Sequence, residues 1–264
     1  MPLRHSNRRV LGVALSVCVA CSALVTTATV LLRPVQQANR LLEKQRHVLA
    51  VAGLLEPGKS VEELSRRLDV RLVDLASGGF VELERPERFD ERRAAGNPAL
   101  SIALPPERDI AGIKRRAKYA RVYLVRNGAG DIETIVLPVY GSGLWSQLYG
   151  FLALEADANT VVGLSFYEYA ETPGLGGELD NPEWKALWPG KQVYDEEGRP
   201  AIRLVRGPVK AWDPQARHQV DALSGATLTT RGIENLLRFW LGPDGFGPFL
   251  ARIRDGEEDG PHDS

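Results

Sequence analysis

Four hydroxyl side chains fall within seven residues near the C-terminal end of the chain. They belong to the stretch DALSGATLTTRGI, residues 221–233: Ser224, Thr227, Thr229 and Thr230. Two small residues, Gly225 and Ala226, separate the first hydroxyl from the other three. An apolar stripe at helical spacing follows and runs to Leu241, which predicts a helix that begins just after this stretch.

The hydroxyl-rich stretch has the chemistry of a phosphate site. The first N–H groups of a helix have no partner within it, and that end of the helix carries partial positive charge. We expect Thr229 or Thr230 to be the N-cap, which accounts for one hydroxyl without any ligand. Thr227 lies one step outside that cap, and Gly225 and Ala226 leave room for an approaching group. The stretch therefore predicts a phosphate site at the helix N-terminus, with the Thr227 hydroxyl not needed for the cap.

Two glycine-rich segments are further candidates for ligand contacts. In GSGLWSQLYG, residues 141–150, the glycines allow backbone to approach a ligand, and Trp145 can stack on a planar ring. A hairpin loop with Trp145 in the core is the alternative. In ETPGLGGE, residues 171–178, a Pro-Gly turn places the Thr172 hydroxyl beside backbone N–H groups that can bind a polar edge. A tight loop without a ligand is the alternative there.

Several common chemistries lack their motifs. The chain has no GxGxxG unit that opens a strand and helix, no phosphate-binding Walker loop, no HExxH zinc motif and no GxSxG nucleophile elbow. Nicotinamide binding, a metal centre and hydrolysis are therefore not expected. The net charge of −1 argues against a nucleic-acid partner, which selects for a basic excess.

The N-terminal region reads as a membrane anchor. Residues 10–32 form an uncharged run of 23 residues. As a helix it would rise about 34 Å, enough for a hydrocarbon core of roughly 30 Å. A cleaved signal, including a lipoprotein signal that ends at Cys21, is the alternative, but the apolar run is too long for it. The arginines before the span favour a cytoplasmic N-terminus and an extracytoplasmic domain.

The remaining elements follow from local patterns. Strands are predicted at 117–125 and 134–140, hairpins at 151–167 and 193–205, and the pattern of residues 82–107 favours a loop. Ser60 with Glu63 predicts a helix that includes Leu64 and Leu68, and Asn181-Pro182 predicts a helix to Trp188. Hairpin strands with helices at the ends indicate an α+β fold with a mostly antiparallel sheet. The expected parts are a cytoplasmic N-terminus (1–9), a transmembrane helix (10–32), an amphipathic stalk helix (33–56), the main domain (57–254) and a disordered acidic tail (255–264).

Together these segments resemble a known family. DALSGAT matches the flavinylation motif Asp-x-x-(Ser/Thr)-Gly-Ala-Thr, and GSGLWSQLYGFLALEAD, ETPGLGGELDNPEW and QQANRLLEKQRHVLAVAGLL are similar to the C subunit of the Na+-translocating NADH:quinone reductase. The likeness runs from the membrane span to about Leu241, with the motifs in the order of the family. One departure is Tyr169, where the family often has His, and it affects a local contact.

The resemblance implies an FMN-binding domain with covalently bound FMN. A flavin transferase, using FAD and magnesium, would attach FMN through a phosphoester to Thr227. The residues carried over from the family's motif as the attachment site are Asp221, Ser224, Gly225 and Ala226. The residues carried over as neighbours of the flavin ring are Leu144, Trp145, Thr172, Gly174 and Leu175.

The resemblance also implies a place in a six-subunit complex of the bacterial inner membrane, with the main domain periplasmic. The chain would relay electrons from NADH toward ubiquinone while the complex pumps sodium, and NADH would be oxidised on another subunit. Three alternatives remain at this point. They are the G subunit of an Rnf-type complex, which shares ETPGLG and the terminal flavin motif, an FMN-bearing anchor of another extracytoplasmic electron pathway, and a structural anchor without redox function.

Overall fold

The structure is a computed structural model that describes residues 4–257, apart from some side chains in its first helix. The chain divides into two compact units, Met1–Lys44 and Gln45–Ser264. Residues 1–3 of the expected cytoplasmic segment and residues 258–264 of the expected acidic tail lie outside the described residues.

Most of the first unit belongs to helix α1 (Arg4–Val51), and its apolar part is suited to a membrane. The segment Arg9–Arg33 is long and apolar enough to cross a bilayer, and its large apolar side chains are exposed. Ser16 and Thr29 donate their hydroxyl protons to the carbonyl oxygens four residues earlier, at 2.9 Å and 2.7 Å. These hydroxyls are therefore paired within the helix, which lowers the free energy of placing them in hydrocarbon.

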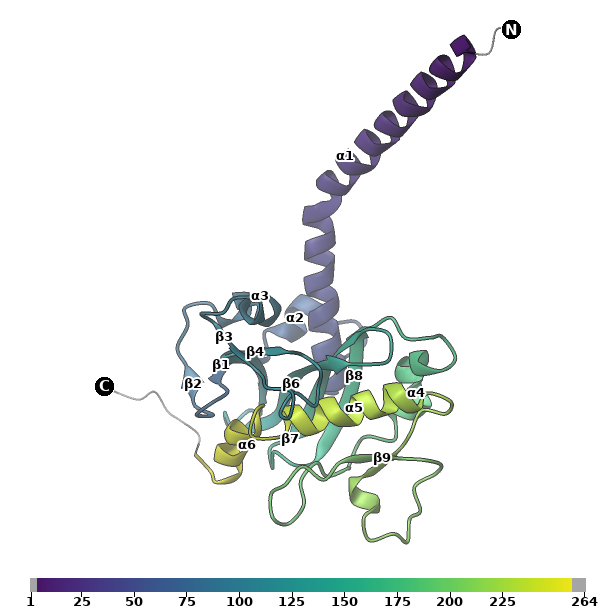
Figure 1. Cartoon of the computed structure of the whole chain (residues 1–264). Helices are drawn as coiled ribbons and strands as arrows, with labels where there is room; N and C mark the ends of the chain where they lie inside the picture. The colour runs from purple at the N-terminus through teal and green to yellow at the C-terminus, as the bar shows by residue number, and fades with distance from the viewer. Residues whose placement is uncertain (1–3, 258–264) are drawn as a thin grey trace. The chain divides into compact units, whose positions relative to one another are not determined.

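The second unit is built on a six-stranded sheet (Figure 1). Its strand order is β2-β1-β5-β6-β7-β8, and every neighbouring pair is antiparallel. The strands are β1 (Leu68–Asp74), β2 (Phe80–Val81), β5 (Tyr119–Arg126), β6 (Ile132–Ser142), β7 (Gln147–Glu155) and β8 (Val161–Glu168). The α+β class with a mostly antiparallel sheet and flanking helices, predicted from the sequence, is confirmed.

Short elements complete the unit. Strands β3 (Ser101–Ala103) and β4 (Arg115–Ala117) pair antiparallel, and β9 (Arg203–Val205) and β10 (Gln219–Asp221) pair parallel. The α-helices are α2 (Val61–Ser65), α3 (Glu91–Ala95), α4 (Pro182–Lys185), α5 (Thr227–Trp240) and α6 (Gly247–Arg254). The 3-10 helices are η1 (Pro86–Arg88), η2 (Gly176–Asp180) and η3 (Ala216–His218).

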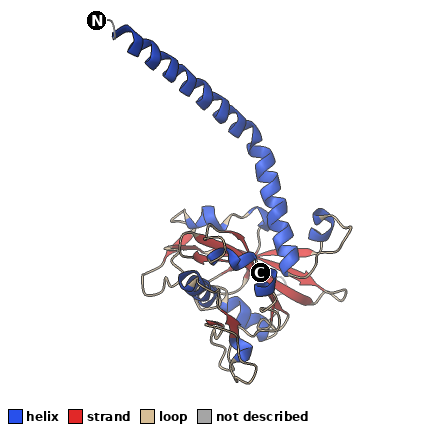
Figure 2. Cartoon of the chain, turned by 90° about the vertical axis from the view of Figure 1, so that its right-hand side faces the viewer, coloured by secondary structure: helices blue, strands red, loops and turns tan. Residues whose placement is uncertain are grey.

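Both faces of the sheet are covered (Figure 2). Alternate residues of β5 point to opposite faces, because side chains alternate along a strand. Val122 and Leu124 join the larger core with apolar residues of α5, whereas Tyr123 and Val125 join a smaller core with Val48 of α1. The last turns of α1 are therefore part of the folded domain, and the helix ends at Val51, five residues before the end of the stalk that we expected.

The first predicted hairpin is confirmed by the pairing of β7 with β8. Asp157 in the turn accepts hydrogen bonds from the backbone N–H groups of Asn159 and Thr160 and from the Thr160 hydroxyl. The start of α4 is also confirmed, because Asn181 accepts a hydrogen bond from the N–H of Glu183. That helix ends at Lys185 and does not reach Trp188.

Two expectations for the N-terminal half were wrong. Ser60 does cap α2, but the helix ends at Ser65, and Leu68 begins β1, which pairs with β5 along its whole length. The predicted loop at 82–107 contains η1, α3 and β3. Its charged residues are ordered by a buried ion pair between Glu91 of α3 and Arg121 of β5, with Nε and Oε1 2.7 Å apart.

The second predicted hairpin forms only at its turn. Asp195 accepts hydrogen bonds from the N–H groups of Glu197 and Arg199, and Tyr194 and Pro200 make a single antiparallel bridge. Beyond that bridge the strand β9 pairs in parallel with β10, a partner remote in sequence. Helix α6 was not expected from the sequence.

Candidate functional site

Helix α5 begins earlier than the sequence suggested. Its N-cap is Ala226, without a side-chain cap, and Thr227 is the first helical residue. The expectation that Thr229 or Thr230 caps the helix was therefore wrong. Gly225 has a φ of +72°, a left-handed conformation that side chains other than glycine rarely adopt, and it turns the chain so that the helix can start at once.

The four hydroxyls divide into two pairs. Thr229 donates its hydroxyl proton to Oε2 of Glu171 at 2.7 Å, and the Thr230 hydroxyl accepts from the N–H of Leu223 at 3.2 Å. Both threonines are buried. Ser224 and Thr227 are exposed, and within residues 4–257 their side chains make no hydrogen bond. Ser224 and Thr227 thus keep their hydroxyls available to a ligand.

A single carboxylate joins this helix to the other two segments. Oε1 of Glu171 accepts hydrogen bonds from the N–H of Trp145 at 3.1 Å and from the N–H and hydroxyl of Ser146, each at 3.3 Å. Oε2 accepts from Thr229 and, at 3.4 Å, from the N–H of Leu144. The turn between β6 and β7, the loop after β8 and the first turn of α5 therefore meet at one buried side chain, which the sequence reasoning had not singled out.

The hydrogen bonds keep this carboxylate ionised. Burial raises the pKa of Glu171, but the bonds donated by Thr229 and by three backbone N–H groups outweigh that effect, so its pKa lies below the ordinary value. The only feature of the sequence that could have pointed to Glu171 was its position directly before the Thr-Pro-Gly turn. Its donors are mostly backbone groups, which no residue type reveals.

The side chains expected near a flavin ring lie at the surface. Trp145 is 71% exposed, so the alternative of a core tryptophan was wrong, and Leu144 and Leu175 are each 43% exposed. Thr172 and Gly174 are also exposed, and the carbonyl of Thr172 closes its turn by accepting from the N–H groups of Leu175 and Gly177. Leu175 reaches the attachment motif, because a Cβ on Gly225 would lie 2.8 Å from its Cδ2.

Asp221 of the motif supports neighbouring segments. Its Oδ1 accepts a hydrogen bond from the N–H of Val209 at 2.8 Å, and its carbonyl oxygen accepts from Nε1–H of Trp184 at 2.9 Å. Tyr169, the departure from the family pattern, donates its hydroxyl proton to Asp180. Burial and this carboxylate both raise the pKa of Tyr169.

A groove of about 750 Å³ lies beside Thr227. Ser224 and Gly225 line it together with Arg206 and Arg231, both exposed and without an ion-pair partner among the residues that the structure describes. The groove therefore brings two guanidinium groups and two available hydroxyls into one cavity. Asp221 and Glu234 also line it, and their carboxylates accept hydrogen bonds from the backbone N–H groups of Val209 and Leu204.

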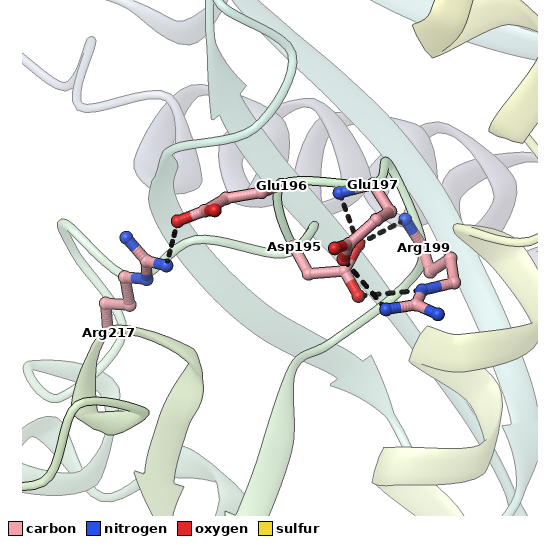
Figure 3. A network of polar contacts seen from close by, with 5 residues as sticks. All are labelled: Asp195, Glu196, Glu197, Arg199 and Arg217. Carbon is pink, nitrogen blue, oxygen red and sulfur yellow. Dashed lines mark hydrogen bonds and ion pairs between the residues drawn. The ribbon is translucent and has the colours of Figure 1, made fainter.

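A second groove of about 780 Å³ lies on the loop between Asp195 and Arg199. Figure 3 shows the charged residues of this loop and their contacts. Asp195 and Glu197 pair with Arg199, and Glu196 pairs with Arg217. His218 uses both ring nitrogens, since Nδ1 bonds the carbonyl of Gln192 and Nε2 accepts from Nε–H of Arg217. Because these charged groups satisfy one another, we place the candidate site at Thr227.

Comparisons with known proteins match this site. The family model of the FMN-binding domain matches residues 143–242, which include all three segments that meet at Glu171. The C subunit of the Na(+)-translocating NADH-quinone reductase from Pseudomonas aeruginosa is 54% identical over 97% of this chain and 100% of its own length. Its counterpart from Yersinia pestis is 49% identical over 94% of this chain and 93% of its own length.

Solved structures show the same fold. The crystal structure of NqrC from Shewanella oneidensis has a TM-score of 0.76 and 41% identity, and the match covers 83% of this chain and 99% of that one. The identities along nearly the whole chain do not support the G subunit of an Rnf-type complex. The chain therefore belongs to the family of the C subunits of the Na+-translocating NADH-quinone reductases, each one part of an oxidoreductase complex.

Proposed function

We propose that this chain carries FMN, linked through a phosphoester to Thr227, and serves as an electron-carrying subunit of a Na+-translocating NADH:quinone reductase. One observation narrows the choice to Thr227 and Ser224, and the resemblance of DALSGAT to the flavinylation motif favours Thr227. The two threonines that follow it, Thr229 and Thr230, are buried and hydrogen-bonded, whereas Thr227 is exposed at the first position of α5. The relatives' names and the FMN-binding family model support the choice of cofactor.

The residues around Thr227 fit such a group. The N-terminus of α5 has N–H groups that favour phosphate, and Arg206 and Arg231 line the adjacent groove. Ser224 can donate to a phosphate oxygen. Leu144, Trp145 and Leu175 are exposed apolar side chains on the neighbouring segments, and they suit the face of a planar ring. Together with Thr172 and Gly174 they form the proposed ring-contact set.

The attachment can be written as a balanced exchange. The Thr227 oxygen attacks the phosphorus of FAD that bears the riboflavin group. A new P–O bond forms, the pyrophosphate P–O bond of FAD breaks and AMP leaves, while the hydroxyl proton passes to a base. We propose that a flavin transferase with magnesium supplies that base, since the hydroxyl of Thr227 contacts no base among residues 4–257. This step involves no oxidation or reduction.

In the assembled complex, bound FMN supplies a carrier for single electrons. We propose that the chain takes electrons that another subunit has removed from NADH and passes them toward ubiquinone, in a complex of six subunits that pumps sodium. Two of the segments that meet at Glu171, the turn between β6 and β7 and the loop after β8, hold the proposed ring-contact side chains at the surface, where a partner's redox centre can come close.

We propose that Arg9–Arg33 anchors the chain in a bacterial inner membrane as a single span, with the main domain in the periplasm. The arginines before the span favour that orientation. An alkaline phosphatase fused after Glu257 should be active in intact cells, and a fluorescent protein that matures only in the cytoplasm should stay dark. The opposite pattern would reject the periplasmic domain.

The cofactor link is tested by the intact mass of the full chain, expressed with and without the flavin transferase. We expect an FMN-sized increase only with the transferase. Fragment masses of the peptide from Val220 to Arg231 should then locate the group on Thr227. An adduct on Ser224, Thr229 or Thr230 would contradict the assignment.

The substitution Trp145→Ala should leave the covalent link in place and change the flavin's absorption spectrum or midpoint potential. Trp145 is 71% exposed, so its removal leaves the core intact and has little effect on the free energy of unfolding. Leu187→Ala, at an exposed leucine on another loop, is the control. Unchanged flavin properties in Trp145→Ala would exclude a contact between the indole and the ring.

A further inference from the structure

Glu171 is 7% exposed and lies where three segments meet, yet the attachment motif does not include it. We propose that Glu171 is the positioning residue of this site: its carboxylate locks the 143–146 turn and the first turn of α5 onto the 171–177 loop, and thereby fixes Leu144, Trp145 and Leu175 around Thr227. It acts through these segments and not by contact with the reacting atoms.

The contacts require a group that only accepts hydrogen bonds. Five donors converge on the two carboxylate oxygens, three of them backbone N–H groups that cannot reverse their role. Ser146 extends the network, since its hydroxyl donates to Glu171 and accepts from the N–H of Ala170 at 2.8 Å. A glutamine would turn an NH₂ group toward N–H donors in either orientation, which leaves buried donors unpaired.

The backbone packs closely around this side chain. A Cβ on Gly143 would lie 2.5 Å from Oε1 of Glu171, and a Cβ on Gly176 would lie 2.9 Å from its Cβ. The glycines on both sides therefore allow the segments to close around this side chain. Among the described residues, the hydrogen bonds of Glu171 are the main polar contacts between these three segments, so the relative positions of Trp145, Leu175 and Thr227 depend in large part on this group.

The consequence for the flavin rests on the proposed function. A buried negative charge beside the ring-contact side chains disfavours addition of electrons to a ring held there. Its removal should therefore raise the midpoint potential of the flavin and, by loosening the turn, change the absorption spectrum. A side chain with a merely structural role would alter stability and leave both flavin properties unchanged.

The test compares Glu171→Gln with Glu178→Gln in the full chain, purified in detergent with and without the transferase. Glu178 lies nearby in η2, and among the described residues its carboxylate accepts only from the side-chain amide of Asn181, so it controls for loss of a charge nearby. Without flavin, we expect at least tenfold faster amide exchange at residues 144–146 in Glu171→Gln only. With flavin, we expect a positive shift of potential in Glu171→Gln that exceeds any shift in Glu178→Gln.

A pH titration adds a signature of the ionised group. Because the folded pKa of Glu171 is lowered, its stabilisation of the turn is present above the ordinary carboxylate pKa of about 4.3 and is lost as the pH falls through the folded pKa. The contribution of Trp145 to the fluorescence, taken as the difference from the same chain carrying Trp145→Phe, should report an acid transition in the wild-type chain and in Glu178→Gln, but not in Glu171→Gln. Thr229→Val removes one donor to Glu171, so it should give part of the increase in amide exchange. Thr229→Ser keeps a hydroxyl donor, so its amide exchange should stay at the wild-type rate.

Two results would overturn the inference. One is a Glu171→Gln chain with wild-type amide exchange at 144–146, and the other is an unchanged flavin spectrum and potential in a fully loaded Glu171→Gln chain. If Glu171→Gln does not fold, Thr229→Val carries the same exchange test. If no chain accepts FMN, the proposed function fails, while exchange and fluorescence of the flavin-free chains still decide the role of Glu171.

Discussion

Thr227→Val should abolish the covalent FMN in full-length chains expressed with the flavin transferase. Valine has nearly the shape of threonine but no hydroxyl, so the phosphoester cannot form. Thr227 is exposed at the first position of α5, and threonine and valine have similar helix propensities, so the fold should not change. Intact mass and flavin fluorescence of the denatured protein in a gel measure the loss, which should be complete.

Ser224→Ala is the matched control for that result. Ser224 is the other exposed hydroxyl of the motif, and its removal should reduce the yield of the adduct without eliminating it. Thermal unfolding of the two variants should differ little from the wild type. Retention of FMN in Thr227→Val, or its complete loss in Ser224→Ala with Thr227 intact, would contradict the assignment of the link.

Gly232→Ala should destabilise the domain although it strengthens the helix. Alanine in place of glycine favours an α-helix by about 1 kcal/mol. A Cβ at Gly232 would overlap the carbonyl oxygen of Ser142 and lie 3.2 Å from the Cα of Gly143, where α5 crosses the end of β6. Overpacking costs about 1–3 kcal/mol, and backbone atoms cannot rotate away. We therefore expect a net loss of up to about 2 kcal/mol and a lower yield of FMN.

Thermal unfolding of the full chain in detergent measures this effect, with an expected decrease in Tm of up to about 8 °C. Gly128→Ala is the control, because its Cβ would meet no atom within 4 Å and its φ is not positive. It should be neutral or slightly stabilising, since alanine restricts the unfolded chain. A higher Tm for Gly232→Ala would show that α5 does not pack this closely on the turn between β6 and β7.

Local sequence patterns predicted the elements whose stability is local. The uncharged run at 10–32 indicated a helix that could span a membrane, and Asp157 and Asn181 marked a turn and a helix start that the structure contains. Alternation of apolar residues predicted the central strands. These features depend on neighbours within a few residues, so the order of side chains specifies them directly.

The same patterns failed where a distant partner decides. Leu68 follows a short helix, and the apolar residues after it, Val70 and Leu72, suit a helix or a strand. Only the available edge of β5 makes Leu68 the start of β1. The charge-rich segment 82–107 contains a helix because Glu91 pairs with Arg121 in the interior. For the same reason β9 takes β10 as its partner and not the strand across its turn.

At the site, the sequence by itself determined which residue types are present: the two glycine-rich segments, the four hydroxyls and the motif whose resemblance names Thr227. Only the tertiary structure decided how the hydroxyls are used. Thr229 is taken by Glu171, which lies 58 residues earlier, and Thr230 by the backbone of Leu223. A hydroxyl's partner depends on which donors and acceptors folding brings within about 3 Å of it, and spacing along the chain does not encode that distance.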